Sequence, residues 1–209
     1  MAAKEAAANG GEGRQMRVAV LTIADLGAVG QRADTSGDAI VDWASERGYE
    51  VVVRSVVADE TDRIAGKLAR WADSGEVDVV LTTGGTGLTE RDVTPEATAA
   101  ILEREAQGIA EAIRAASGPG FPRAWLSRGR AGTRGKTLII NLPGSTNGVK
   151  EGLAVLAQFL DHAVDLLTGT NTSHAPSSPS PEEPALSAAK GRGGQGVRTH
   201  GGQGVRTHG

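Results

Sequence analysis

The residues with the clearest capacity for chemistry stand together in TTGGTGLTERD, at residues 82–92. Gly84, Gly85 and Gly87 lack Cβ atoms, so the backbone can adopt unusual conformations and a ligand can approach its N–H groups closely. Glu90 and Asp92 follow in the same segment, and carboxylates of this kind hold Mg²⁺ beside a bound phosphate. These residue types predict a site for an anionic, phosphate-bearing ligand with a metal ion.

A glycine-rich turn can also serve only to close a strand–helix connection tightly. This segment carries more hydroxyl and charged side chains than a turn requires, which favours a binding function. They are Thr82, Thr83, Thr86, Thr89, Arg91, Asp92 and Thr94. The segment contains neither G-x-x-x-x-G-K-[ST] nor G-x-G-x-x-G. The latter spacing occurs at residues 191–196, in the C-terminal tail, where no strand precedes it and no helix follows.

The scarcity of other reactive side chains narrows the chemistry. The chain has no cysteine, and the part expected to fold has one histidine, His162, which we interpret as a helix-surface or interface residue among leucines. Ser-His-Asp, Cys-His and histidine–metal mechanisms are therefore disfavoured. Carboxylates with Mg²⁺, glycine amides and the cations Arg91, Arg128 and Lys150 remain. This set suits phosphoryl or nucleotidyl transfer, where catalysis is mostly positioning and charge neutralisation.

The segments on either side of the glycines indicate how they are positioned. Residues 79–81 form a short apolar, partly β-branched run, which is typical of a buried strand in a parallel sheet. Thr94 is a suitable N-cap for a helix, with Pro95 at its first position and Glu96 in its first turn. A glycine loop between a strand end and a helix start is a natural place for a phosphate.

The rest of the chain alternates between strand and helix patterns. Further strands are predicted at residues 17–23, 50–57, 124–127 and 137–142. Helices are predicted at about residues 37–47, around residues 64–71, from 95 to about 117, and from 149 to 167. The alternation predicts an α/β sandwich with a largely parallel sheet. Asp59 follows the strand at 50–57, at the end where residues of such sheets contact ligands.

Composition divides the chain of 209 residues into three parts. Residues 1–15 are polar and rich in Ala and Gly, and residues 170–209 are rich in Ser, Pro, Gly and Thr. Neither part can bury a core, so both are predicted to be disordered. The octapeptide GGQGVRTH occurs twice in the tail, at residues 193–200 and 201–208. A single folded domain is expected at residues 16–169.

Charge and hydropathy exclude several classes of protein. The formal net charge of −3 and the pI near 5.8 argue against a protein that binds nucleic acid by neutralising its phosphates. No apolar run approaches the ~20 residues of a membrane span, and the first residues lack the apolar core of a signal peptide. We therefore expect a soluble, cytoplasmic protein that binds neither nucleic acid nor membranes.

Residues 82–98, TTGGTGLTERDVTPEAT, resemble the signature of the molybdenum-cofactor biosynthesis proteins of the MogA/MoaB type, which is also seen in the G domain of gephyrin. The resemblance extends to four further places along the chain. They are residues 34–37 (DTSG), Asp59, residues 126–128 (LSR) and residues 140–145 (INLPGS). Together these motifs cover nearly all of residues 16–169 in the right order, and they leave out the leader and the tail.

The resemblance implies a fold and a reaction. The fold is a three-layer α/β/α sandwich, usually assembled as a homotrimer or a hexamer. The active members are molybdopterin adenylyltransferases, which transfer AMP from Mg·ATP to the terminal phosphate of molybdopterin and release pyrophosphate. Their product goes on to metal insertion, so a downstream molybdenum-insertion enzyme is an expected partner.

Site residues follow from the resemblance position by position. Asp59 and Asp92 match the family's essential acidic residues, and we assign them to catalysis and to Mg²⁺ binding. The residues that would cradle phosphate through backbone amides are Gly84, Gly85, Thr86 and Gly87. Those that would form a second wall of the pocket are Asn141, Pro143, Gly144 and Ser145. The expected molybdopterin contacts are Ser36, Ser127 and Arg128, and the further expected substrate or nucleotide contacts are Gly37, Thr83, Arg91, Thr94, Pro95, Glu96 and Lys150.

This chain departs from the family pattern at the edges of the site. Ala24 stands where a serine is common, and Glu90 replaces the proline that usually precedes the Arg-Asp pair. Residues 146–147 are Thr-Asn rather than Pro-Lys, so a cation that could neutralise phosphate is missing; Lys150, one helical turn on, is a candidate to compensate. These changes are expected to affect the catalytic turnover of the protein more than its binding of the substrate.

Two other functions stay open at this point. A non-catalytic molybdopterin-binding or trimeric scaffold protein of the MoaB type is favoured by Glu90 and Asn147, whereas the intact pair Asp59 and Asp92 favours the enzyme. A related domain found in nucleotide-pyrophosphatase or damage-inducible proteins is the weaker alternative, because those chains usually carry a further domain.

Overall fold

The computed structural model describes residues 14–25 and 33–170. The predicted leader up to residue 13 and the predicted tail beyond Thr170 lie outside the described residues. The chain divides into two compact units, residues 1–173 and 174–209, and every described residue belongs to the first. No helix in this described part is long and apolar enough to cross a membrane.

A six-stranded sheet forms the middle layer, with the strand order β2-β1-β3-β6-β5-β4. The strands are β1 (Arg17–Ile23), β2 (Glu50–Val57), β3 (Val79–Thr83), β4 (Arg104–Glu105), β5 (Ala131–Arg134) and β6 (Thr137–Leu142). β2, β1, β3 and β6 are mutually parallel, whereas β5 is antiparallel to both β6 and β4. The predicted mostly parallel sheet is thereby confirmed.

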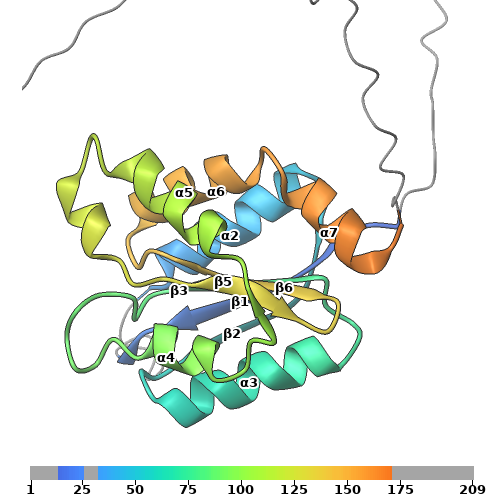
Figure 1. Ribbon diagram of the computed structural model, residues 1–209, viewed down its shortest axis with the longest axis horizontal. Coiled ribbons are helices and arrows are strands. Elements are labelled where there is room, and N and C mark those ends of the chain that lie inside the picture. Colours follow the sequence, from blue (N-terminus) through green and yellow to red (C-terminus); the bar gives the residue numbers. More distant parts are fainter. Residues whose placement is uncertain (1–13, 26–32, 171–209) are drawn as a thin grey trace, which may run out of the picture. The chain divides into compact units, whose positions relative to one another are not determined.

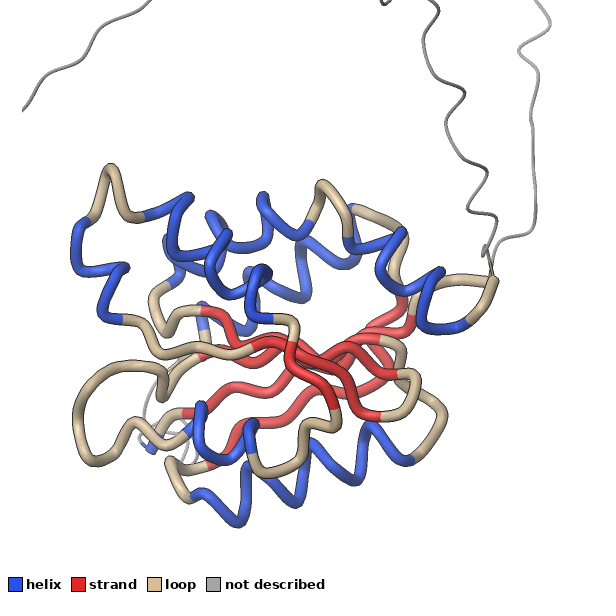
Figure 2. The backbone as a smooth tube through the Cα atoms, in the orientation of Figure 1, coloured by secondary structure: helices blue, strands red, loops and turns tan. Residues whose placement is uncertain are grey.

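Helices cover both faces of this sheet, which gives the predicted three-layer α/β/α arrangement (Figures 1 and 2). One face carries α2 (Thr35–Glu46), α5 (Gln107–Ser117), α6 (Thr146–Leu156) and α7 (Leu160–Thr168). The other carries α3 (Thr61–Asp73) and α4 (Thr94–Ala99). β2 and β3 lie on opposite sides of β1, so the strand order reverses between β1 and β3, which is where ligands bind in open α/β sheets.

The central strand β3 is buried along its whole length. Val79 and Leu81 pack into the cluster beneath α2 and α6, and Val80 packs into the cluster beneath α3. Full burial stabilises each such side chain by roughly 1.5–3 kcal/mol. The strand is therefore fixed from both faces, and the glycine segment that follows it starts from a rigid position.

The helix predicted from residue 95 to 117 is two helices, α4 and α5, with the short strand β4 between them. Ile101 and Leu102 pack on the α3 face of the sheet, whereas Ile109 and Ile113 pack on the α6 face. One straight helix cannot serve both faces. The chain therefore crosses the edge of the sheet at β4, where it pairs with β5.

Two further predictions of secondary structure are wrong. The strand predicted at residues 124–127 is part of a 3-10 helix, η1 (Pro122–Leu126), and Trp125 and Leu126 are exposed rather than buried in the sheet. The helix predicted at 149–167 is interrupted by a turn at residues 157–159, which separates α6 from α7. The apolar stripe continues across the turn, since Leu156 and Leu160 are both buried.

A buried carboxylate ties β1 to β3 at their amino ends. Asp78 is only 4% exposed. It accepts hydrogen bonds from the Arg17 amide (2.9 Å), from two guanidinium nitrogens of Arg17 (3.2 and 3.0 Å) and from Arg14 (2.7 Å). Burial raises the pKa of Asp78, but the hydrogen bonds from Arg17 outweigh it and hold the pKa below its usual value.

We predict that Asp78→Asn lowers the free energy of unfolding by about 2 kcal/mol at neutral pH, because Arg17 loses its charged partner. Since the pKa of Asp78 is lower in the folded state, this stabilisation is present above the unfolded-state pKa of about 3.9 and is lost as the pH falls through the folded-state value. Urea denaturation should show that the difference in the free energy of unfolding between Asp78→Asn and the wild type becomes smaller as the pH falls. Asp42→Asn, at an exposed position on α2, is the control, and equal stability of Asp78→Asn and wild type at pH 7 contradicts the prediction.

Candidate active site

The glycine segment after β3 requires glycine at two positions. Gly84 and Gly85 have φ angles of +99° and +62°. A Cβ atom on Gly84 would stand 2.1 Å from the Ile23 carbonyl oxygen, and one on Gly85 would stand 2.8 Å from Asp59 Oδ1. The loop therefore passes directly over the end of β1 and against the carboxylate that follows β2.

Thr94 holds the first half of this loop. Its hydroxyl donates to the Gly84 carbonyl (3.0 Å) and its amide donates to the Gly85 carbonyl (3.1 Å). The prediction that Thr94 is the N-cap of α4 is wrong: it is the first helical residue and Val93 precedes it, with no side-chain capping bond. The hydroxyl is engaged across the loop. Pro95 is therefore the second helical residue rather than the first, and Glu96 lies in the first turn, as predicted.

Arg128 holds the second half of the loop. Its amide donates to the Thr86 carbonyl (2.9 Å) and its Nε donates to the Gly87 carbonyl (2.7 Å). Its two terminal nitrogens donate to the Asp92 carbonyl and to the Glu96 carboxylate. Arg128 was predicted to contact a ligand, and the structure directs its guanidinium to the glycine loop.

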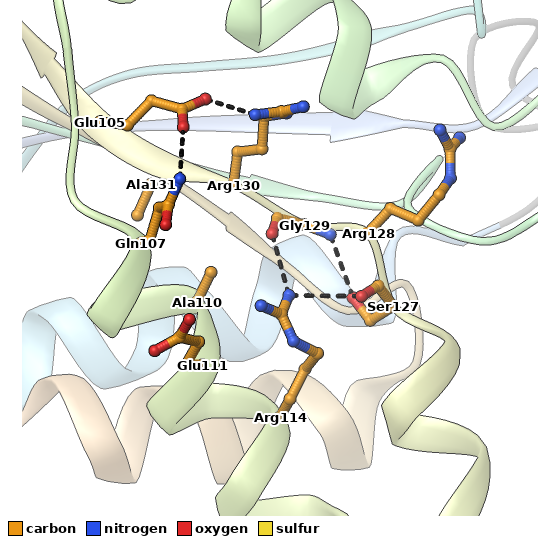
Figure 3. A pocket seen from close by; sticks show the side chains of 10 residues that line it. All are labelled: Glu105, Gln107, Ala110, Glu111, Arg114, Ser127, Arg128, Gly129, Arg130 and Ala131. Carbon is orange, nitrogen blue, oxygen red and sulfur yellow. Dashed lines mark hydrogen bonds and ion pairs between the residues drawn. The ribbon is translucent and has the colours of Figure 1, made fainter.

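A second arginine fixes the segment from which Arg128 extends. Arg114 of α5 donates to the carbonyls of Ser127 (3.3 Å) and Gly129 (3.1 Å). Both arginines border a small pocket of about 300 Å³, and the Arg128 side chain points away from Arg114 (Figure 3). In the same pocket Arg130 pairs with Glu105, so much of its charge is neutralised within the protein.

The two predicted acidic residues differ in their surroundings. Asp92 Oδ2 accepts from the amide (2.8 Å) and the hydroxyl (2.6 Å) of Thr89. Burial raises the pKa of Asp92, but these bonds and one from the Gly87 amide outweigh it, so its pKa is lowered. The pKa of Asp59 is raised, first by burial and then by the negative charges of Asp25 and Asp92.

Arg91 does not neutralise this pair directly. Its guanidinium donates to both carboxylate oxygens of Asp25 (2.7 and 2.6 Å), and Asp25 in turn accepts from the Asp59 amide (3.1 Å). Within residues 14–25 and 33–170, no group of three or more His, Cys, Asp or Glu side chains is arranged to hold a metal ion. Asp59 and Asp92 therefore offer at most two protein ligands, which is the number Mg²⁺ commonly takes when phosphates and water complete its shell.

A cavity of about 740 Å³ opens beside the glycine loop. Its lining includes eight of the predicted site residues: Gly85, Thr86, Gly87, Asp92, Ser127, Pro143, Gly144 and Ser145. The sequence analysis did not assign nine others to the site: Ser117, Phe121, Arg123, Ala124, Leu126, Thr146, Asn147, Gly148 and Glu151. The cavity thus joins the glycine loop, the turn after β6 and the segment from the end of α5 through η1.

Several predicted residues lie behind this lining and position it. The Asn141 amide donates to the Thr82 and Thr98 hydroxyls (both 3.0 Å) in the core. The Thr83 hydroxyl donates to the Pro143 carbonyl (2.7 Å) and the Ser36 hydroxyl to the Gly144 carbonyl (3.0 Å).

Asp59, Gly37 and Lys150 are among the predicted residues that are absent from the lining. At Gly37 a Cβ would stand 2.1 Å from Asp34 Oδ2, so this glycine is needed for the start of α2. Lys150 is exposed on α6 and is absent from the cavity lining, whereas its neighbour Glu151 is part of it. The expected compensating cation is therefore not at Lys150.

The apolar wall of the cavity is the feature that sequence reasoning missed. Phe121 is 55% exposed and Leu126 is 53% exposed, and both line the cavity. Residues 124–127 were predicted to form a strand, so the exposure of their apolar side chains was not expected. The Gly118–Pro119–Gly120 segment just before them was the available signal, because it ends α5 and starts an irregular stretch.

Comparisons with known proteins agree with this geometry. Residues 19–162 match a family described as a probable molybdopterin binding domain. The chain is 43% identical over 149 residues to the molybdenum cofactor synthesis protein cinnamon of Drosophila melanogaster, covering 71% of this chain and 25% of that protein. It is 38% identical over 156 residues to molybdopterin adenylyltransferase of Helicobacter pylori, covering 74% of this chain and 89% of that protein.

The fold is likewise similar to solved structures. The crystal structure of the molybdopterin biosynthesis enzyme MoaB from Thermus thermophilus superposes with a TM-score of 0.70 at 46% identity. That superposition covers 74% of this chain and 98% of the Thermus chain. The similarity therefore spans nearly the whole of the Thermus chain.

We predict that Gly84→Ala lowers the free energy of unfolding by about 3 kcal/mol or more, because the strain of a positive φ adds to a clash with the Ile23 backbone. Gly75→Ala is the matched control: Gly75 has a similar φ of +71°, but a Cβ there meets nothing within 4 Å. It should cost about 1 kcal/mol. Urea denaturation of both variants separates the clash from the φ strain, and equal losses would rule out the close passage over β1.

Proposed function

The chain belongs to the family of probable molybdopterin-binding domains, and we propose that it transfers AMP from ATP to the terminal phosphate of molybdopterin. The observation that carries this proposal is one cavity of about 740 Å³ that joins the glycine loop, the Asp92 carboxylate and an apolar wall. An organic ring system has room against Phe121 and Leu126, while phosphates meet the polar end. Relatives named for molybdopterin adenylyltransferase and molybdopterin biosynthesis support the same chemistry.

The glycine loop is suited to bind phosphate because its carbonyls are already engaged. The carbonyls of residues 84–87 accept hydrogen bonds from Thr94 and Arg128. In a trans peptide the N–H points opposite to the C=O, so the amides of Gly85 and Thr86 face away from these donors. Neither amide has a hydrogen-bond partner among the described residues. Two free N–H groups beside the cavity are a natural anion site.

Asp59 and Asp92 are the residues we propose for Mg²⁺. Both carboxylates lie against the glycine loop, since Cβ atoms placed on Gly85 and Gly87 would each come within 2.8 Å of one of them. The raised pKa of Asp59 reflects burial first and then the surplus of negative charge from Asp25 and Asp92, and a cation would relieve that surplus. Bound there, Mg²⁺ would supply charge neutralisation to the phosphates of ATP.

The proposed reaction needs no nucleophile from the protein. An oxygen of the pterin phosphate forms a bond to the α-phosphorus of ATP, the bond from that phosphorus to the bridging oxygen breaks, and pyrophosphate leaves with the electron pair. The chain has no cysteine, and His162 lies on α7, outside the cavity lining. The protein's part is to hold the two phosphates in line and to stabilise their charge.

A binding protein without turnover is the second candidate. Asn147 and Glu151 line the cavity where the family commonly has a lysine nearby, so the described lining is less positive than an active site for two phosphates needs. This observation favours pterin binding with slow or no transfer. The intact pair Asp59 and Asp92 favours the enzyme.

The family resemblance also supports proposals about context. We propose that the protein acts in the cytoplasm as a homotrimer or hexamer. A molybdenum-insertion enzyme would receive its adenylylated product. Light scattering of the purified protein measures the assembly.

The test of function is pyrophosphate release from Mg·ATP by the purified protein, with and without molybdopterin. We predict release that requires both molybdopterin and Mg²⁺. Asp92→Asn should reduce it by at least about a hundredfold, because a group that stabilises transferring phosphates is lost. Asp62→Asn, on α3 away from the cavity, is the control. Tight molybdopterin binding without release would establish the binding protein instead.

A further inference from the structure

The cavity beside the glycine loop is lined by more negative than positive side chains. Of its 17 lining residues, three are charged: Asp92, Glu151 and Arg123. The lining alone thus carries a net charge of −1, from two carboxylates and one guanidinium. A substrate with a phosphate monoester meets this negative lining, so the position of the single cation decides where its phosphate can lie.

Other cations near the cavity are engaged within the protein. Arg128 donates to the glycine loop and Arg91 donates to Asp25. Arg114 donates to the carbonyls of Ser127 and Gly129. Lys150 is absent from the lining. The guanidinium groups of Arg128, Arg91 and Arg114 are thus already used in contacts within the protein.

Arg123 differs from these cations. It lies on η1 and lines the cavity, and it pairs with no carboxylate in the described part of the chain. Its backbone position is fixed by a series of turn hydrogen bonds, from Phe121 N to Ser117 O (2.8 Å) and from Ala124 N to Phe121 O (2.8 Å). The other lining residues of the same segment, Phe121, Ala124 and Leu126, are uncharged, and the carboxylates of the lining, Asp92 and Glu151, lie on other segments.

We propose that Arg123 binds the phosphate monoester of the pterin substrate and thereby determines specificity for the phosphorylated ligand. This inference rests on the proposed function. In this chain the position after the second glycine turn where the family commonly has lysine is Asn147, and Asn147 lines the same cavity as Arg123. The positive charge is thus supplied from η1 rather than from α6. A guanidinium can bind a phosphate through two parallel hydrogen bonds, which an ammonium cannot.

The test compares two ligands, molybdopterin and its dephosphorylated form, by equilibrium binding to the full chain. Arg123→Gln should weaken the binding of molybdopterin about tenfold or more, the usual effect of losing a charge-assisted hydrogen bond. It should leave the binding of the dephosphorylated ligand unchanged. Arg123→Lys should lie between wild type and Arg123→Gln. Arg70→Gln removes the same charge from α3, outside the cavity, and should bind both ligands as the wild type does.

Steady-state kinetics give a second readout. Arg123→Gln should raise the KM for molybdopterin about tenfold or more, because a contact to the phosphate of that substrate is lost. The proposal is overturned if Arg123→Gln binds molybdopterin as tightly as the wild type does. It is also overturned if the substitution weakens the binding of both ligands equally. A wild type that binds both ligands but releases no pyrophosphate overturns the adenylyl transfer alone. A wild type that binds neither pterin overturns both.

Discussion

Two residues, Thr94 and Arg128, hold all four carbonyl oxygens of the glycine loop at residues 84–87. Because C=O and N–H point in opposite directions across each peptide, fixing the carbonyls also fixes where the amides point. Held in this way by two side-chain and two backbone donors, the loop presents the N–H groups of Gly85 and Thr86. The proposed phosphate site therefore depends on contacts from the start of α4 and from residue 128, more than thirty positions further along the chain.

Close backbone packing explains why this loop contains glycines. Gly84 passes over the Ile23 carbonyl, and a Cβ on Gly144 would lie 3.3 Å from Gly84 Cα. The loop after β3 and the turn after β6 thus pack backbone to backbone at the carboxyl ends of neighbouring parallel strands. Their strands are buried from both faces, so the two turns are held at fixed positions and the cavity between them is preformed.

Local patterns in the sequence were enough to predict the parallel sheet and the glycine loop, because strand, turn and helix start follow one another within twenty residues. The pairing of Asp59 with Asp92 came from the family resemblance and stays a prediction. Contacts between distant segments were not predictable in this way. The hydrogen bonds from Arg128 to the loop carbonyls form only once the chain has folded. The apolar wall that includes Phe121 and Leu126 likewise depends on tertiary packing. The single helix predicted from residue 95 failed for the same reason, since its apolar residues serve opposite faces of the sheet.

We propose that phosphate binds to the Gly85 and Thr86 amides of the glycine loop, with a metal held by Asp59 and Asp92. The decisive measurement is a crystal structure of the protein with Mg²⁺ and a non-hydrolysable ATP analogue. We expect phosphate oxygens at about 2.9 Å from the Gly85 and Thr86 nitrogens, with the metal bound to both carboxylates. Phosphates bound elsewhere in the fold, or a metal that contacts neither carboxylate, would contradict it.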